Sequence, residues 1–244
     1  MNFATAWLRT IEVHPELGST NDRALELCGQ PDKLPALVVA ERQTAGRGRQ
    51  GAVWFAPEGS LTFSLAVRPA AWGISLAQWP ALSLTTAIAV ADAVQPLLPA
   101  SMPAQIKWPN DVFVTGRKLA GILLESAPTT SDALVIGVGL NVNGALASAG
   151  EQAPLGVTLE ELTGRTHSID ALLENFIAAF DQRAAQLGAS DEELAVEWNR
   201  QSLLTNRDVI IDLGAERVSG RCVGLANNGA LRLATASVVA HPRQ

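Results

Sequence analysis

The sequence predicts an α+β fold, a mixed β-sheet with flanking helices, followed by a small all-β unit. The larger unit is predicted by apolar runs of strand length that are joined partly by helices and partly by hairpin signals, rather than by strict β-α-β alternation. The smaller unit is predicted by a change of pattern at about Asp208, after which short strands alternate with turns. We place the boundary near Leu204 to Arg207 and expect domains at residues 1–204 and 205–244.

Caps, apolar runs and prolines predict the elements of the first half. The stretch "GSTND" supplies capping residues for a short helix that begins at Ser19. Pro80 suits the early part of a long apolar helix and Pro96 its end. The pair Gly116-Arg117 is a hairpin signal between two strand-like runs. The expected order is a helix at 19–27, strands at 36–42 and 61–67, a helix at 75–98, and strands at 104–108, 111–116, 118–126 and 132–142.

Two amphipathic helices and a series of short strands complete the prediction. The first helix has an apolar face, and the second opens with Ser190 and Glu193 as a capping box. The apolar face consists of Ile169, Leu172, Leu173, Phe176, Ile177 and Phe180. The strands of the small unit are "DVIID" at 208–212, "RVSGRCVG" at 217–224, "ALRLA" at 230–234 and "SVVA" at 237–240.

Composition excludes several classes of function. With 244 residues, 48% of them hydrophobic, the chain can bury a sizeable core and is not disordered. A net charge of −6 argues against a generic nucleic-acid binder, and the longest apolar runs are too short to span a bilayer. The N-terminal stretch lacks the pattern of a signal peptide. Cys28 and Cys222 lie far apart in the sequence, and we expect both to be free thiols in a reducing compartment. We therefore expect a cytoplasmic protein with no membrane contact, and no metal-ligand spacing occurs.

The stretch "GRGRQG" at 46–51 fits the pattern of a dinucleotide-binding loop, but its context does not. That interpretation requires a helix after the glycines, and Pro57 and Gly59 follow too closely. It also requires an acidic residue about 20 residues further on, where the sequence reads "AVRPA". A solvated basic hairpin and an anion-binding loop remain. In the latter, glycines let backbone N–H groups approach an oxyanion, and Arg47 and Arg49 supply charged donors.

Three further stretches combine polar residues with turns. In "KWPND", proline before Asn110-Asp111 predicts a tight turn that brings Lys107 close to them. Lys118 begins an otherwise apolar strand in which Gly121 lets a ligand approach the backbone, and "GVGLNVN" ends another apolar strand with glycines and asparagines. Each stretch alone is also compatible with an ordinary turn or a charged strand end. Together with the basic loop, in this order, they indicate one site.

This combination closely resembles the biotin protein ligases, which attach biotin to carrier domains of carboxylases. The resemblance covers nearly the whole chain and implies a class II synthetase-like catalytic domain followed by a small SH3-like β-barrel. It also implies ATP and biotin as substrates, Mg²⁺ with the ATP, biotinyl-adenylate as the intermediate, and a biotin carboxyl carrier protein domain as partner. The stretches that carry it are "STN" at 19–21, "ERQTAGRGRQG" at 41–51, "KWPND" at 107–111, "RKLAGILLE" at 117–125 and "GVGLNV" at 137–142.

The matching positions imply roles for individual residues. Hydroxyl and amide side chains match the contacts to the ureido group and ring, and the basic loop matches the lining of the carboxylate and α-phosphate. Lys118 matches the group that stabilises charge growing on the reacting oxygens, and Asp111 the group that orients the carrier amine. The implied catalytic residues are Lys118, Arg49 and Asp111. The implied biotin contacts are Ser19, Thr20, Asn21, Gln43, Gly46, Arg47, Gly48, Arg49, Trp54 (for which core packing is the alternative), Lys118 and Gly121, and the nucleotide contacts are Arg49, Lys107, Asn110, Asp111, Lys118 and Asn141.

The sequence departs from the family pattern at two places, and alternatives remain open. Ala52 stands where many relatives carry a further arginine, and the tail "LRLATASVVAHPRQ" lacks the usual close of the small domain. Only 18 residues precede Ser19, too few for the DNA-binding domain of some relatives, so we expect no DNA binding. A lipoate or octanoate ligase or transferase of the same fold and a non-enzymatic biotin-binding regulator are the alternatives, and both a monomer and a homodimer are compatible with the sequence.

Overall fold

The computed structural model describes residues 7–128, 130–146, 156–212, 214, 216–226 and 228–234. Short 3-10 helices lie at Pro31–Lys33, Arg49–Gly51, Pro69–Trp72, Leu76–Gln78 and Gln95–Leu97. The strands and α-helices, in chain order, are β1 (Thr10–Leu17), α1 (Thr20–Cys28), β2 (Ala36–Gln43), β3 (Leu61–Val67), α2 (Ala81–Val94), β4 (Gln105–Lys107), β5 (Asp111–Val114), β6 (Arg117–Ser126), β7 (Leu134–Leu140), α3 (Leu159–Thr163), α4 (Ile169–Ala189), α5 (Asp191–Gln201), β8 (Asp208–Asp212), β9 (Arg217–Leu225) and β10 (Leu231–Ala234).

The main sheet is mixed, as predicted. Seven strands are hydrogen-bonded in the order β1-β2-β3-β7-β6-β5-β4. β1 and β2 run parallel, since α1 forms the crossover between them. The remaining neighbours in the sheet pair antiparallel. The central strands β3 and β7 are buried along their whole length, because helices cover both faces of the sheet there.

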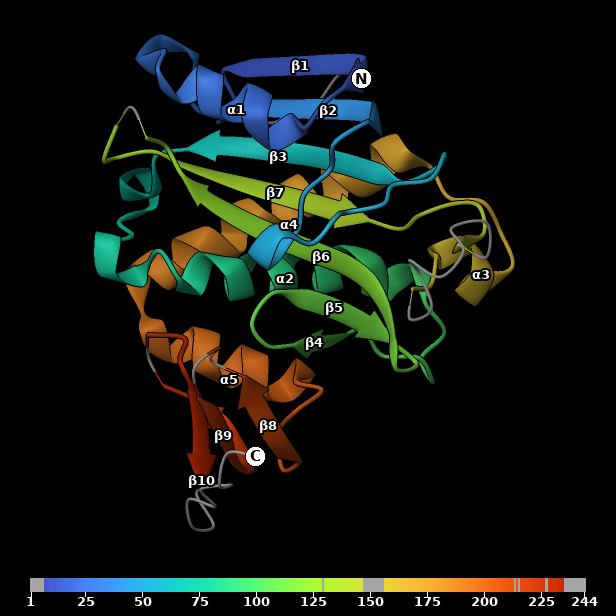
Figure 1. The fold of residues 1–244 in the computed structure, drawn as a ribbon, viewed down its shortest axis with the longest axis vertical. Helices are drawn as coiled ribbons and strands as arrows, with labels where there is room; N and C mark the ends of the chain where they lie inside the picture. The colour runs from blue at the N-terminus through green and yellow to red at the C-terminus, as the bar shows by residue number, and fades with distance from the viewer. Residues whose placement is uncertain are drawn as a thin grey trace, which may run out of the picture.

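The helices divide between the two faces of the sheet (Figure 1). α1 packs on one face, against β2, β3 and β7, while α2 and α4 lie against the other. α2 is buried almost all round, since it lies between the sheet and α4. Phe63 of β3 and Phe176 of α4 pack with ring centroids 4.8 Å apart, and the predicted apolar face of α4 is buried except for Ile169, which is half-buried. The larger core cluster therefore lies on the face of the sheet opposite α1, and a smaller one lies under α1 itself.

The small unit is a three-stranded antiparallel sheet in the order β10-β9-β8. It packs on α5 through β9, and Cys222 and Leu225 of β9 join the main core. The turn before β10 also contacts the larger unit, because Trp108 Nε1 donates a hydrogen bond to the carbonyl oxygen of Gly229 at 3.1 Å. The predicted strand at 237–240 lies outside the described residues.

Most predicted elements are confirmed within a few residues, and the differences have local causes. The apolar run 75–98 is not one helix: a 3-10 turn precedes α2 and another ends it at Pro96. The β5–β6 turn is centred on Thr115 and Gly116, both with positive φ, one residue before the predicted pair. Ser190 caps α5 as predicted, but its side chain accepts from the Glu192 N–H and not from the Glu193 N–H that the predicted capping box would use.

β1 and α3 were not predicted. β1 is an edge strand that alternates polar and apolar residues and contains Pro15, and α3 is only five residues long. Neither element therefore carries a strong apolar signal. None of the helices in the described part of the chain combines the length and apolarity that crossing a bilayer requires.

Candidate functional site

A cavity of about 250 Å³ lies on the α1 face of the sheet, between β6 and β7 below and the loop after β2 above. Its floor is built from glycines. A Cβ atom on Gly139 would lie 2.2 Å from Trp54 Cε2, and a Cβ on Gly137 would lie 2.2 Å from Asn21 Oδ1. Gly121, opposite Gly139 in the β6–β7 register, leaves room for Trp54 and Lys118. The three glycines therefore leave space for the Trp54, Asn21 and Lys118 side chains that line the cavity.

The basic loop forms the roof. Trp54 N–H donates to the Gly46 carbonyl at 2.9 Å, and Gly48 N–H donates to the Ala52 carbonyl at 2.7 Å, so the loop closes on itself as a hairpin. The loop contains only the 3-10 turn Arg49–Gly51, and the next element after Gly51 is β3, so no helix follows the glycines, as expected when the dinucleotide interpretation is excluded. The Trp54 ring lies against the Gly139 floor, and its buried Nε1 has no hydrogen-bond partner among the described residues. Trp54 thus offers an apolar wall and one unused donor.

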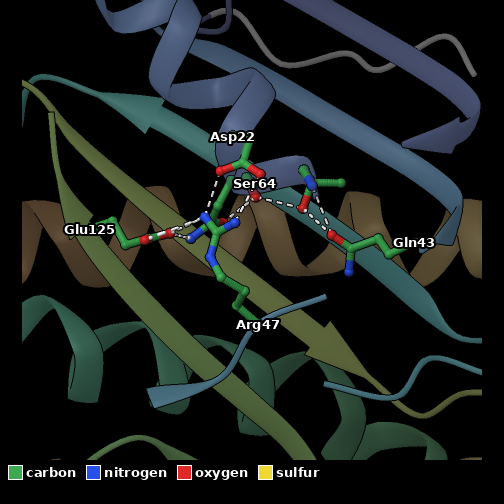
Figure 2. Close-up of polar contacts among 7 residues, drawn as sticks. Asp22, Gln43, Arg47, Ser64 and Glu125 are labelled. Carbon is green, nitrogen blue, oxygen red and sulfur yellow. Dashed lines mark hydrogen bonds and ion pairs between the residues drawn. The ribbon is translucent and has the colours of Figure 1, made fainter. Parts of the chain in front are cut away.

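One end of the cavity, here called the amide end, is lined by Thr20, Asn21 and Gln43, with the buried Ser64 directly behind them. Gln43 Oε1 accepts from the Thr20 backbone N–H at 2.8 Å and from its hydroxyl at 3.2 Å. Ser64 Oγ lies 2.7 Å from Thr20 Oγ1 and 2.5 Å from Asn21 Oδ1 (Figure 2). Thr20, Asn21 and Ser64 are buried, so their groups are fixed by this network. The arrangement suits a small polar ring with both donors and acceptors.

The other end, here called the cationic end, consists of Arg49, Asn110, Asp111 and Lys118. Lys118 Nζ lies 2.7 Å from Asp111 Oδ1 and 5.5 Å from the centroid of the Trp54 ring. Arg49 Nη1 donates to Asn110 Oδ1 at 3.4 Å, and Asn110 Nδ2 donates to the Ile122 carbonyl at 2.8 Å. Positive charges outnumber negative ones by one at this end, so it suits an anion.

The two loop arginines have different partners. Arg47 forms two hydrogen bonds to Asp22, Nη1 to Oδ2 at 2.8 Å and Nη2 to Oδ1 at 2.6 Å, and approaches Glu125 at 3.3 Å (Figure 2). The Arg47 hydrogen bonds lower the pKa of the Asp22 carboxyl, and the same bonds raise the pKa of the arginine. Arg49 is paired only with a neutral amide in the described structure. Of the two, Arg49 is therefore the arginine with charge available for an anionic ligand.

Most of the residues implied by the resemblance meet at this cavity. Lys107 lies opposite Asp111 across β4 and β5, but its Nζ lies 5.2 Å from the centroid of the Phe113 ring and does not line the cavity. Asn141 is buried behind the site, where its Nδ2 donates to the Lys118 carbonyl at 3.3 Å, and Gly46 pairs with Trp54 in the roof. The lining includes Ser19, Thr20, Asn21, Gln43, Arg47, Gly48, Arg49, Trp54, Asn110, Asp111, Lys118 and Gly121.

Several residues of the site were missed. Glu125 ends a stretch that was recognised, on the same strand face as Gly121 and Leu123, and this two-residue spacing is a signal that could have identified it. Asp22 follows "STN" directly. Ser64 lies within an apolar strand and carries no such signal. In the described ranges no group of three histidine, cysteine, aspartate or glutamate residues could hold a metal ion.

Comparisons with known proteins agree with this geometry. Residues 16–143 match the model of the biotin/lipoate A/B protein ligase family. The chain is 34% identical over 230 residues to a biotin–[acetyl-CoA-carboxylase] ligase of Mycobacterium tuberculosis, covering 92% of this chain and 83% of that one. It is 34% identical over 221 residues to the ligase of the same name from Paracoccus denitrificans, covering 88% and 90%. The biotin protein ligase of Aquifex aeolicus, solved in complex with biotin and ATP, superposes with a TM-score of 0.79 at 28% identity, covering 94% of this chain and 93% of that one.

Proposed function

Because the chain belongs to the biotin/lipoate A/B protein ligase family, we propose that it is a biotin protein ligase, which activates biotin with ATP and transfers it to a lysine of a biotin carboxyl carrier protein domain. The observation that carries this proposal is a cavity with two unlike ends, a network of neutral amides and hydroxyls at one and excess positive charge at the other. Biotin has the same polarity, with an uncharged ureido ring and a carboxylate joined by an apolar chain.

The amide end binds the ring. The uncharged groups of Thr20, Asn21 and Gln43 supply donors and acceptors that match a cyclic urea. Their hydrogen bonds to one another and to Ser64 hold them in place before the ligand arrives. The glycine floor and the Trp54 ring enclose the apolar part of the ligand. This leaves the carboxylate at the cationic end, where Arg49 and Lys118 attract it.

Activation takes place at the cationic end. A carboxylate oxygen of biotin attacks the α-phosphorus of ATP, a new O–P bond forms, and the bond from that phosphorus to the bridging oxygen breaks as pyrophosphate leaves. Negative charge on the phosphate oxygens grows during this step. Lys118, on a strand of the main sheet, stabilises that charge, and Arg49 in the roof holds the product by its planar fork.

Transfer uses the same groups. The carrier lysine amine attacks the acyl carbon of the biotinyl-adenylate, an amide bond forms, and the C–O bond to AMP breaks. Asp111, which lies 2.7 Å from Lys118 and is the carboxylate of the described cavity lining, orients the incoming amine and accepts the proton that the amine loses. Asn141 supports Lys118 through the backbone of its strand. The ion pair with Asp111 also keeps the Lys118 side chain in place between the two steps.

Mg²⁺ would be bound as its complex with ATP. This ion normally keeps several waters and is held by one or two carboxylates together with substrate phosphates. Asp111 is the carboxylate that the described cavity lining offers for it. We further propose a cytoplasmic protein that binds no operator DNA, since its net charge is −6. A homodimer remains a proposal that sedimentation would test.

Transfer to a carrier is the direct test of this function. The protein is incubated with ATP, Mg²⁺, biotin and a biotin carboxyl carrier domain, and the mass of the carrier is measured by intact mass spectrometry. We expect one biotinyl group on the wild-type carrier and none on a carrier whose target lysine is arginine. Labelling by lipoate or octanoate with none by biotin would identify a lipoate-type enzyme, and biotin binding without labelling would identify a regulator.

A further inference from the structure

Arg47 joins three separate elements at the amide end. It extends from the roof loop to Asp22 in α1 and to Glu125 in β6 (Figure 2). The Asp22 contact is bidentate, at 2.8 and 2.6 Å, and the Glu125 contacts are longer, at 3.4 and 3.3 Å. One guanidinium therefore connects the roof to a helix and to the floor strand.

Glu125 has a second contact within the site. Its Oε2 accepts a hydrogen bond from Asn21 Nδ2 at 2.5 Å, and Asn21 Oδ1 lies 2.5 Å from Ser64 Oγ on the other side. The Asn21 side chain is buried and fits closely over Gly137, where even a Cβ would collide with it. A buried amide held at both ends has one orientation, and Glu125 supplies the acceptor that sets it.

Glu125 acts on the ligand through its neighbours. It is absent from the described lining of the cavity, whereas Asn21 and Arg47, which it contacts, both line it. The carboxylates of Asp22 and Glu125 also outnumber the single positive charge of Arg47. An anionic group is therefore repelled from the amide end, which favours the orientation of biotin described above.

We propose that Glu125 is a positioning residue of the ligase reaction. Its carboxylate orients the Asn21 amide and, together with Asp22, holds Arg47, so that the amide end keeps its shape and the roof loop stays over the cavity. This inference rests on the proposed function, because it concerns how tightly biotin and its adenylate are held. It assigns Glu125 no contact with the reacting atoms, which lie at the opposite end.

The first test replaces Glu125 and separates binding from chemistry. Glu125→Ala leaves the buried Asn21 Nδ2 without its acceptor, so the Kd for biotin should rise about 10- to 100-fold, while the rate constant of adenylate formation at saturating biotin should stay within about threefold of wild type. Glu125→Gln keeps an oxygen for Asn21 and loses only the charge near Arg47. Its Kd should rise only about two- to fivefold. Calorimetry measures the Kd and rapid quench the rate constant.

The second test asks whether Asp22 acts through Arg47. Asp22→Asn should raise the Kd for biotin about two- to fivefold in the wild-type background. In an Arg47→Met background the same substitution should change the Kd by less than about 1.5-fold, since the guanidinium it pairs with is gone. Glu125→Ala should still raise the Kd in that background, because its contact with Asn21 remains.

Asp92 provides a matched control. Like Glu125 it accepts from an arginine and an amide, from Arg183 Nε at 2.7 Å and Gln201 Nε2 at 3.4 Å, and its side chain is 27% exposed against 29% for Glu125. It lies in α2, on the other face of the sheet from the cavity. Asp92→Ala should bind biotin as wild type does, even where it melts at a lower temperature.

The outcomes are distinct. The positioning role would be overturned if Glu125→Ala bound biotin with the wild-type Kd, or if Asp92→Ala lost as much affinity as Glu125→Ala. It would also be overturned if Glu125→Ala lowered the rate constant and left the Kd unchanged. If Glu125→Ala does not fold, as judged by circular dichroism, Glu125→Gln and the Asp22–Arg47 cycle decide it in the same way. Failure of the wild type to bind or activate biotin would instead refute the proposed function.

Discussion

Lys118 is the residue whose removal should most slow adenylate formation. Its Nζ faces the cavity at the cationic end, 2.7 Å from Asp111 and on a rigid strand of the main sheet. Lys118→Ala removes one positive charge from that end and leaves Asp111 unpaired. The substitution therefore removes an attraction for the phosphate and adds a repulsion.

The geometry sets the size of the effect. Two unit charges about 4 Å apart interact by about 4 kcal/mol at the effective dielectric constant of a protein surface. The Lys118 side chain is 32% exposed, so solvent screening lowers this ceiling. A loss of about 3 kcal/mol corresponds to about a 10²-fold lower rate, within the usual range for one charge-stabilising donor. The biotin Kd should change by less than about fivefold, because the charge it stabilises grows in the transition state.

Rapid-quench measurement of adenylate formation checks this prediction. Lys33→Ala, at an exposed lysine in the 3-10 turn Pro31–Lys33, is the control and should match wild type. A near-normal rate in Lys118→Ala together with a large loss in Lys107→Ala would refute the assignment and move the role to Lys107.

Three further predictions follow from other parts of the molecule. In Gly139→Ala the new Cβ would lie 2.2 Å from the Trp54 ring and displace it, so the biotin affinity measured by calorimetry should fall about tenfold, whereas Gly18→Ala, whose Cβ meets nothing within 4 Å, should bind normally. The hydrogen bond from Arg23 lowers the pKa of Glu12 from 4.5 to about 2. A depressed carboxyl pKa contributes stability that is present above the unfolded pKa and is lost as pH falls through the folded pKa. In denaturant titrations at neutral pH, the free energy of unfolding of Glu12→Gln should therefore be lower than that of wild type by on the order of 1 kcal/mol. Between about pH 4.5 and about pH 2, the variant should lose less stability than wild type does. At physiological salt the protein should give no sequence-selective mobility shift with DNA upstream of biotin-synthesis genes, and a nanomolar shift would contradict the inference from its net charge of −6.

Local sequence signals predicted much of this fold. The runs at 36–42 and 61–67 form strands because a short, continuous apolar run suits a strand whose two faces are both covered by helices. Ser190 caps its helix because its hydroxyl can accept from a free backbone N–H. β1 could not be predicted in the same way. It is held by its pairing with β2. Its apolar residues Ile11 and Val13 are exposed, so burial of an apolar face does not define this strand.

The candidate site was predictable where it is carried by motifs and not where it depends on long-range contacts. Lys118 and Arg49 belong to recognised stretches and line the cavity. Glu125 and Asn21 are 104 residues apart in sequence, and only the packing of α1 on the sheet brings them together. Arg47 differs from Arg49 because it pairs with Asp22, and no spacing rule connects Asp22 to the loop. Such pairings are tertiary, and a single sequence does not encode them as a local pattern.

Biotin-dependent exchange of labelled pyrophosphate into ATP tests the central claim most directly, because it reports the activation step alone and needs no carrier. With Mg²⁺ present, exchange should be fast with biotin and should remain at background with lipoate, with octanoate or without an acid. Exchange with lipoate or octanoate but not with biotin, or biotin binding with no exchange, would contradict the account.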